Sequence, residues 1–376
     1  MRPDIGDAEI EAVVDAMRSG WLTTGPVSAA FEREFADYLG GGRHAIAVNS
    51  ATAGLHLALE AIGVGPGDEV LVPTWTFTAT AEAVSYLGGN PVLVDVDPVT
   101  LCIDFADAER RVTERTVAIA PVHYAGLAVP AGELSAFAAK HGLRVVEDAA
   151  HALPTLNEGT LVGAGDFDAT VFSFYATKTM TTGEGGMVVT PDADLAQRMR
   201  IMRLHGIDRD VFNRYSSPRA GWVYDVVGAG YKHNITDTAS AMGRVQLRRT
   251  PEMARRRTEI AAHYHESFAG LPVQLPPDAP AGSSHCWHLY NLRLNADAPL
   301  SRDDFIERMT ELGIGTSVHF IPLHMLTYWR ERFDHTPEQF PVASAEFTRC
   351  VSLPIFSAMT DDDVELVVTS VRSLLS

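Results

Sequence analysis

The sequence predicts an α/β protein with a mainly parallel sheet in a large domain and a smaller α+β domain at the C-terminus. Three observations predict this class. Short, nearly all-apolar segments alternate with helical patterns up to Thr190. Helical patterns predominate after that residue, and a proline-rich segment at residues 271–284 precedes the last strand and helix patterns. Short apolar strands that alternate with helices are typical of a parallel sheet buried on both faces.

Seven apolar segments are expected to form the strands of the large-domain sheet. They span residues 45–50, 69–73, 91–97, 117–123, 143–148, 169–175 and 186–190. Helical patterns at residues 52–63 and 131–142 lie between some of them. In such sheets ligands bind at the carboxyl ends of the strands, so polar residues at strand ends are the first candidates for a site.

The other elements are expected in the second half of the chain. Helices are expected from Asp192 to about Gly206 and from Thr236 to about Gly270. Beyond the proline-rich segment, the patterns indicate strands at 287–294 and 315–320 and capped helices at 301–313 and 360–375. We therefore divide the chain into a large domain at residues 1–250 and a small domain at residues 251–376.

Composition excludes several classes of protein. The 376 residues are 46% hydrophobic and 21% charged, which is ordinary for a globular enzyme. A formal charge of −18 argues against a nucleic-acid partner, because phosphate backbones require a basic surface. The three cysteines have no spacing that suggests a disulfide framework or a zinc site, and we expect no metal. No stretch is long and apolar enough for a membrane span, so we expect a cytoplasmic protein without membrane association.

Polar residues stand at the ends of several expected strands. Lys178 follows the strand at 169–175 and precedes a glycine-rich turn, Asp148 ends the strand at 143–148, and Ser50 leads into a helix. Each has an ordinary explanation when taken alone. A loop lysine is usually a surface residue, and an acid or a serine before a helix is often only a cap.

Together these residues are the parts that pyridoxal 5′-phosphate requires. A lysine amine binds its aldehyde, and an acid keeps its pyridine nitrogen protonated. A helix N-terminus such as the one at Ala51 and Thr52 attracts its phosphate, and an aromatic side chain covers its ring. Trp75 and Phe77 follow a third strand and are either core residues or the aromatic cover. The sequence therefore predicts pyridoxal 5′-phosphate as the cofactor.

Along nearly its whole length the sequence also resembles the DegT/DnrJ/EryC1/StrS family of pyridoxal-phosphate sugar aminotransferases. That family has the aspartate aminotransferase fold, type I. The stretches that carry the resemblance are SGWLTTGP, NSATAGLHLAL, GDEVLVPTWTFTATAEA, VVEDAAHA, GDFDATVFSFYATKTMTTGEGGM, GYKHNITDTASAMGRVQL, GIGTSVHFIPLH and SLPIFSAMTDDDV.

The resemblance implies roles for four residues near the cofactor ring. Lys178 would bind the cofactor covalently and later move a proton between the substrate carbon and the cofactor. Asp148 would pair with the pyridine nitrogen, and His151 would lie close to the ring and its phenolic oxygen. Phe77 would stack on the ring, a position for which Trp75 is less well placed. The presence of Lys178 favours transamination over the dehydratase branch, which has histidine there.

The resemblance also implies a phosphate site shared between two chains. Ala51, Thr52 and Ser173 would bind the phosphate from one chain. Family members are homodimers, and the GYKHN segment reaches the partner's site. Lys232 or Asn234 would therefore contact the cofactor phosphate of the neighbouring subunit.

The implied substrate is a nucleotide-linked ketosugar, usually a 4-keto-6-deoxyhexose on dTDP or UDP, with L-glutamate as the amino donor. GYKHNITD is more similar to the branch that acts at C4 than to the branch that acts at C3. His319 and His324 lie in a region similar to the one that borders the sugar nucleotide in relatives, although histidines on an apolar strand are more often structural. A 3-ketosugar, a cyclitol ketone and a non-catalytic regulatory role remain alternatives.

Overall fold

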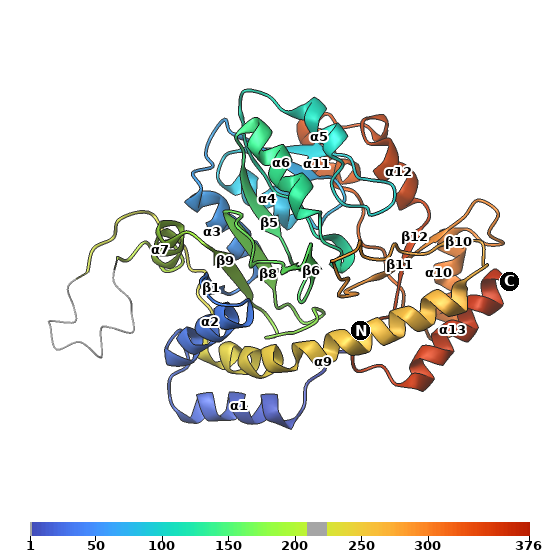
Figure 1. Cartoon of the computed structure of the whole chain (residues 1–376), viewed down its shortest axis with the longest axis horizontal. Coiled ribbons are helices and arrows are strands. Elements are labelled where there is room, and N and C mark those ends of the chain that lie inside the picture. The colour runs from blue at the N-terminus through green and yellow to red at the C-terminus, as the bar shows by residue number, and fades with distance from the viewer. Residues whose placement is uncertain (1, 209–223) are drawn as a thin grey trace.

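The computed structural model describes residues 2–208 and 224–376, and its centre is a seven-stranded sheet (Figure 1). The strand order is β1-β9-β8-β5-β4-β2-β3. All neighbours are parallel except β9, which is antiparallel to both β1 and β8. The expected mainly parallel sheet is therefore confirmed. Its strands are β1 (His44–Val48), β2 (Glu69–Pro73), β3 (Asn90–Val94), β4 (Thr116–Ile119), β5 (Arg144–Asp148), β8 (Ala169–Ser173) and β9 (Gly186–Thr190).

Helices surround this sheet and continue into the C-terminal part of the chain. They are α1 (Asp7–Arg18), α2 (Pro26–Tyr38), α3 (Ala51–Ala61), α4 (Ala79–Tyr86), α5 (Phe105–Arg111), α6 (Ala131–His141), α7 (Ala193–Met202), α9 (Asp237–Phe268), α10 (Arg302–Glu311), α11 (Thr327–Phe333), α12 (Pro341–Phe347) and α13 (Asp361–Leu375). Three single turns of 3₁₀ helix occur at Tyr124–Gly126, Leu323–Met325 and Pro337–Gln339. None of the helices within the described ranges combines the length and apolar character that crossing a membrane requires.

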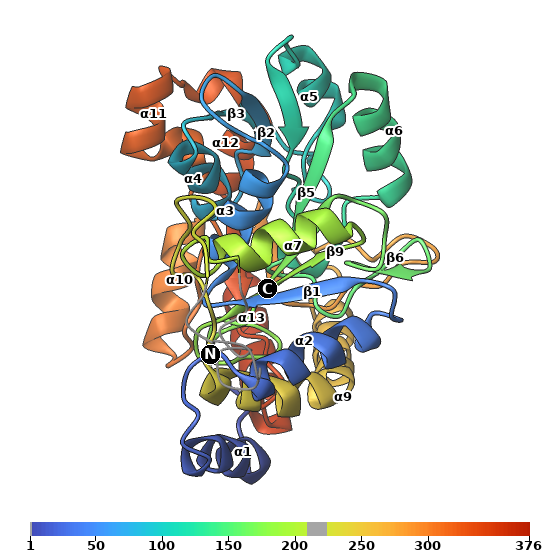
Figure 2. The same ribbon diagram turned by 90° about the vertical axis from the view of Figure 1, so that its left-hand side faces the viewer.

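The sheet is covered on both faces because successive side chains of a strand point in opposite directions. In β1, Ile46 and Val48 join an apolar cluster with α3 and α7, whereas Ala45 and Ala47 join a second cluster with α2 and α9. Figures 1 and 2 show these two pairs of helices on opposite sides of the sheet. This double burial explains why the strands lack the polar alternation of a one-sided sheet.

Helix α3 packs on the sheet through a glycine that leaves no space for a side chain. A Cβ at Gly54 would lie 2.7 Å from Cγ1 of Val171 and 3.0 Å from Cγ2 of Val188. Both distances are shorter than a side chain at this position could tolerate without movement of its neighbours. Gly54 therefore sets the depth of α3, whose N-terminus is part of the site described below.

Helix α9 is a continuous helix of 32 residues that connects the two parts of the molecule (Figure 1). Its first half packs against α1 and α2, and its second half packs against α13. Pro251 lies inside it. The boundary that we draw between residues 250 and 251 thus falls within one helix.

The C-terminal part has its own three-stranded antiparallel sheet, in the order β10 (Val273–Gln274), β11 (Tyr290–Leu294) and β12 (Cys350–Leu353). Residues of α10 and α13 pack on it in a separate apolar cluster. A small additional hairpin joins β6 (Leu156–Asn157) to β7 (Thr160–Leu161).

The prediction of a strand at residues 315–320 is wrong. Only Ser317 pairs there, in an isolated bridge to Ser352, and the third strand of the small sheet is β12. The chain leaves the sheet after Ser317 because the main chain of His319 has a different partner. Its carbonyl oxygen accepts a hydrogen bond of 3.0 Å from the indole N–H of Trp75. Phe320 is partly buried against the apolar cluster of the large sheet, so the pattern of this segment reflects that contact and not strand pairing.

Candidate active site

A cavity of about 480 Å³ lies at the carboxyl ends of the parallel strands. Asp148 is the last residue of β5, Ser173 is the last residue of β8, and Val122 follows β4. This is the edge at which the strand–helix pattern predicts a ligand. The size is within the range of small-molecule sites, about 300–1,000 Å³.

The cavity brings together most of the predicted site residues. Those that line it are Ala51, Thr52, Phe77, Asp148, His151, Ser173, Lys178 and His319. Lys232, Asn234 and His324 are not part of its lining. The chain thus collects the expected ring and phosphate residues at one place, although their individual roles stay predictions.

Lys178 is held in a turn just after β8. Its backbone N–H donates to the carbonyl oxygen of Tyr175 at 2.9 Å. Burial lowers the pKa of the Lys178 amine to about 8, against the opposing effect of the Asp148 carboxylate, which raises it. A larger fraction of the amine than in an ordinary lysine is therefore uncharged near neutral pH, and a nucleophilic lysine requires the uncharged form.

Asp148 is buried and is fixed by two hydrogen bonds. Its Oδ2 accepts from the hydroxyl of Thr80 at 2.7 Å, and its Oδ1 accepts from the backbone N–H of Ala150 at 3.0 Å. The Thr80 hydroxyl also lies 3.1 Å from that of Thr76. Sequence reasoning missed Thr80, whose signal is a hydroxyl four residues after Thr76 at the start of α4.

His151 has a defined tautomer and orientation. Its Nδ1 accepts a hydrogen bond of 3.3 Å from the backbone N–H of Ala125, which places its proton on Nε2. Its ring lies nearly parallel to that of Phe320, with the centroids 5.9 Å apart. Burial, assisted by the charge of Lys178, lowers the pKa of His151 well below its ordinary value. His151 is therefore a neutral hydrogen-bond donor in the cavity wall.

The predicted phosphate residues meet where β9 passes the N-terminus of α3. Ser173 is paired with Gly186 in the β8–β9 ladder. A Cβ at Gly186 would lie only 2.9 Å from the backbone nitrogen of Ala51. Ser50 caps the helix by accepting from the N–H of Ala53 at 3.1 Å. The helix N-terminus and Ser173 thus form a cradle with the donors that an anion requires.

His319 is fixed by a chain of hydrogen bonds that also defines its tautomer. The Ser352 hydroxyl donates to Oδ1 of Asn291 at 2.6 Å, so Nδ1 of His319 must donate to Ser352 at 3.0 Å. Its Nε2 then carries a lone pair. Burial lowers the pKa of His319 to about 4, and the charge of Lys178 acts in the same direction. In contrast to His151, His319 offers a hydrogen-bond acceptor.

His324 lies outside the cavity lining, where its ring nitrogens have partners in the protein. Nδ1 is 2.8 Å from the Thr74 hydroxyl, and Nε2 is 3.0 Å from the Ser344 hydroxyl. The side chain is 1% exposed. These contacts describe a structural histidine, and nothing in its placement supports the expected contact with substrate.

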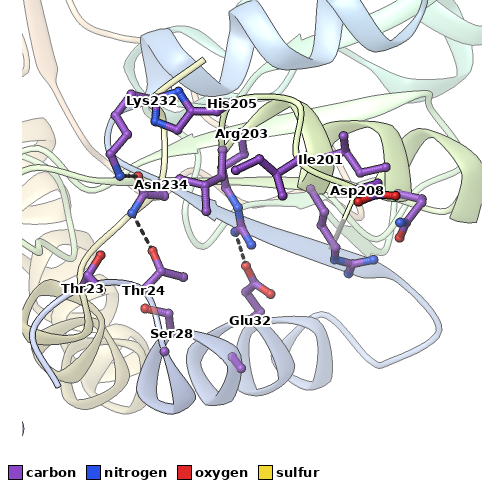
Figure 3. Close-up of a pocket in the computed structure, with 16 residues that line it drawn as sticks. Thr23, Thr24, Ser28, Glu32, Ile201, Arg203, His205, Asp208, Lys232 and Asn234 are labelled. Carbon is purple, nitrogen blue, oxygen red and sulfur yellow. Dashed lines mark hydrogen bonds and ion pairs between the residues drawn. The ribbon is translucent and has the colours of Figure 1, made fainter. Parts of the chain in front are cut away.

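Lys232 and Asn234 line a second cavity of about 440 Å³ between α2 and α7 (Figure 3). The Lys232 amine donates to the side-chain oxygen of Asn234, whose amide donates to the Thr24 hydroxyl at 2.8 Å. The backbone carbonyl of Lys232 accepts from the Asn49 amide at 3.2 Å. The two residues thus line a cavity other than the one that contains Lys178.

Several cavity residues have no counterpart in the predictions. They are Leu55, Thr76, Ala79, Val122, Ala150, Tyr175, Thr177, Glu184, Gly185, His288 and Phe320. The three histidines of this lining, His151, His288 and His319, come from distant parts of the chain. Even so, no group of three or more His, Cys, Asp or Glu side chains within residues 2–208 and 224–376 could hold a metal ion.

These residues match the chemistry of pyridoxal phosphate. The amine of Lys178 can bind its aldehyde, the carboxylate of Asp148 retains lone pairs beyond the two bonds described above, and the α3 cradle provides donors for its phosphate. The donor set therefore fits the cofactor.

Comparison with known proteins gives the same answer. The profile of the DegT/DnrJ/EryC1/StrS aminotransferase family matches residues 3–372. The spore coat polysaccharide biosynthesis protein SpsC of Bacillus subtilis is 44% identical over 375 residues, which cover 99% of this chain and 96% of SpsC.

Solved structures agree along the whole chain. Spr1654 of Streptococcus pneumoniae in its PMP form has a TM-score of 0.93 and 32% identity, covering 99% of this chain and 98% of Spr1654. The sugar aminotransferase CalS13 of Micromonospora echinospora has a TM-score of 0.87 and 31% identity, covering 99% of this chain and 98% of CalS13. The chain therefore belongs to the DegT/DnrJ/EryC1/StrS aminotransferase family and is a sugar aminotransferase that uses pyridoxal phosphate.

Proposed function

We propose that this enzyme converts a nucleotide-linked ketosugar, a 4-keto-6-deoxyhexose on dTDP or UDP, to the aminosugar with L-glutamate as the amino donor. The observation that carries the proposal is the partly neutral amine of Lys178 in one cavity with Asp148. SpsC, which is named for polysaccharide biosynthesis, supports a sugar substrate. In the balanced reaction, the amino group replaces the keto oxygen of the sugar, and glutamate becomes 2-oxoglutarate.

Four of the cavity residues have a proposed task in the chemistry at the cofactor ring. When bound, pyridoxal phosphate supplies an electron sink for the carbon that loses a proton. Lys178 holds the cofactor covalently and, as a free amine, takes up that proton and returns it. Asp148 keeps the pyridine nitrogen protonated through a charge-assisted contact. The N–H of His151 supports the phenolic oxygen, and Phe77 covers the ring.

For the sugar, we propose that His319 accepts a hydrogen bond from a hydroxyl group. Its Nδ1 is committed to Ser352, so only the lone pair on Nε2 remains for a ligand. A hydroxyl-rich hexose provides the donor that this atom requires. A charged amine is a poorer partner for His319 because Lys178 already places a positive charge nearby.

We further propose that the enzyme is a homodimer with two composite sites. The support is the position of Lys232 and Asn234 in a second cavity that contains none of the ring residues of their own chain (Figure 3). Light scattering should give the mass of two chains, and Lys232→Ala should weaken cofactor binding at unchanged fold. A monomer that binds the cofactor tightly contradicts the composite site.

The substrate is tested with a panel of ketones and isotopically labelled glutamate. The panel contains dTDP- and UDP-linked 4-ketosugars, a nucleotide-linked 3-ketosugar and a cyclitol ketone. We expect label transfer to a 4-ketosugar at the highest kcat/KM. Preference for the 3-ketosugar or the cyclitol refutes the C4 assignment, whereas absence of transfer from glutamate to any member refutes the amino donor.

We place this reaction in the cytoplasm. The three cysteines of the chain are all free and buried, which suits a protein of a reducing compartment.

A further inference from the structure

His288 is a cavity residue to which the proposed chemistry gives no task. It is 3% exposed and lines the cavity, and its ring packs against that of His151 with the centroids 4.3 Å apart. Its Nδ1 is buried without a hydrogen-bond partner. An unpaired polar atom at such depth is costly, because it has lost water and gained nothing in exchange.

The loop around His288 is held firmly by its main chain. The buried guanidinium of Arg257 donates to the carbonyl oxygen of Trp287 at 3.1 Å, and the N–H of Leu289 donates to the carbonyl oxygen of Ala125 at 3.1 Å. Trp287 adopts a φ of +53°, which is unfavourable for a residue with a side chain. Strained residues of this kind cluster at functional sites. The main chain thus imposes the position of the imidazole.

The same contacts define what His288 presents to the cavity. Nδ1 is sealed in the protein, and neither ring nitrogen has a hydrogen bond to any residue in the described part of the chain. A proton on Nδ1 would leave a buried N–H unpaired, which is rarer than an unpaired acceptor. The proton therefore belongs on Nε2, and His288 presents a neutral N–H donor beside that of His151.

Cationic donors are scarce in this cavity, whose other side-chain donors are hydroxyl groups and imidazoles. Of the lining side chains that the structure describes, only Lys178 carries an amine or guanidinium group, whereas Asp148 and Glu184 are acidic. An amino-acid donor brings a carboxylate next to its amine, and Lys178 is occupied with the reaction itself. We propose that His288 donates a hydrogen bond from Nε2 to the α-carboxylate of the amino donor. This inference rests on the proposed function only in taking that donor to be an amino acid.

Two substitutions separate hydrogen bonding from packing. His288→Phe keeps a ring against His151 but removes the nitrogen, whereas His288→Gln loses the ring but places an amide N–H near the position of Nε2. The two half-reactions of the holoenzyme are measured separately, with L-glutamate from the pyridoxal form and with a ketosugar from the pyridoxamine form. The Kd of glutarate, a dicarboxylate without an amine, is measured by titration of the cofactor absorbance.

We expect His288→Phe to slow the glutamate half-reaction and to weaken glutarate binding by about tenfold or more, the effect of losing a hydrogen bond to a charged group. His288→Gln should stay within about threefold of wild type. The ketosugar half-reaction and the cofactor Kd should change little. Tyr290→Phe is the matched control, because it removes another buried and unpaired polar atom, the Tyr290 hydroxyl, from the same segment outside the cavity lining and should leave both half-reactions unchanged.

Several results overturn the proposal. One is a His288→Phe enzyme that reacts with glutamate within twofold of wild type, and another is an equal loss in both half-reactions. If His288→Phe does not fold, His288→Asn replaces it, since its amide is too short to reach the position of Nε2 and should fail where His288→Gln succeeds. If the wild-type enzyme does not react with glutamate but reacts with another amino acid, only the identity of the proposed amino donor is refuted. The His288 variants and the wild-type enzyme are then assayed with that amino acid.

Discussion

Asp148→Asn separates the charge of this side chain from its shape. The amide occupies the same volume, and its oxygen can still accept from the N–H of Ala150. The Thr80 hydroxyl, which donates to Asp148 at 2.7 Å, must then accept from the new amide nitrogen. Thr80 can make this change because Thr76, 3.1 Å away, can take the hydroxyl proton. The substitution is therefore expected to leave the cavity intact.

The effect on catalysis should be large because the lost charge lies in a buried site. A charge-assisted contact that keeps the pyridine nitrogen protonated, so that the ring can accept the electron pair in the transition state, is worth about 3 kcal/mol or more. Since each 1.36 kcal/mol changes a rate tenfold, we expect the transamination rate to fall by a factor of about one hundred or more. The carboxylate also raises the pKa of Lys178, so the pKa of that amine should fall further in the variant.

Two measurements on one preparation test this reasoning. Cofactor occupancy is read from the absorbance of the bound chromophore, and the single-turnover rate is measured with L-glutamate. We expect occupancy near that of wild type and a greatly reduced rate. If both stay near wild type, Asp148 is only a residue that caps the following turn. If the variant loses both the cofactor and its fold, Thr80 and Thr76 do not rearrange their hydrogen bonds around the asparagine amide as we expect.

Three further predictions follow from the site. Lys178→Ala should abolish turnover and covalent cofactor binding, and transamination that persists without added amine contradicts the assignment. Cofactor association with the cofactor-free enzyme should accelerate as the pH rises through about 8, because only the neutral amine of Lys178 attacks the cofactor aldehyde. Asp148→Asn should shift the midpoint of this pH dependence to lower pH, and a rate that does not depend on pH refutes the role of the amine. Gly186→Ala should weaken cofactor binding and lower the free energy of unfolding by about 1–3 kcal/mol, because the new Cβ would lie 2.8–2.9 Å from backbone atoms. The control Gly165→Ala has space for its Cβ and should change neither the melting temperature nor the Kd of the cofactor measured by absorbance titration.

The sequence predicted correctly the features that depend on residues close together along the chain. Burial on both faces makes the strands of the large sheet nearly all apolar, and the parallel arrangement places Asp148 and Lys178 at one edge. The same reasoning failed for the segment at 315–320, because its Phe320 packs, partly buried, against the core of the large sheet and not in the small one. Periodicity records burial but not the partner that provides it.

The same limit explains the residues that were missed or misplaced. His288 stands in an apolar stretch, and its unpaired nitrogen becomes visible only once the Ala125 and Arg257 contacts are known. His324 looks equivalent to His319 in sequence, yet it is satisfied by Thr74 and Ser344. Hydrogen-bond partners that lie hundreds of residues apart leave no local pattern in the sequence.

The antiparallel direction of β9 has a consequence for the enzyme while no cofactor is bound. Because β9 runs back along β8, both ends of the segment at residues 174–185 are tied at the same edge of the sheet, and the N–H of Phe174 donates to the carbonyl oxygen of Gly185 at 2.9 Å. A parallel strand would have required a long crossover there. The entropy of closing the loop that carries Lys178 is thus lost when the sheet folds and not when the cofactor arrives. The lysine should keep its place between one cofactor molecule and the next, so that loss of the cofactor leaves an enzyme ready to be reloaded.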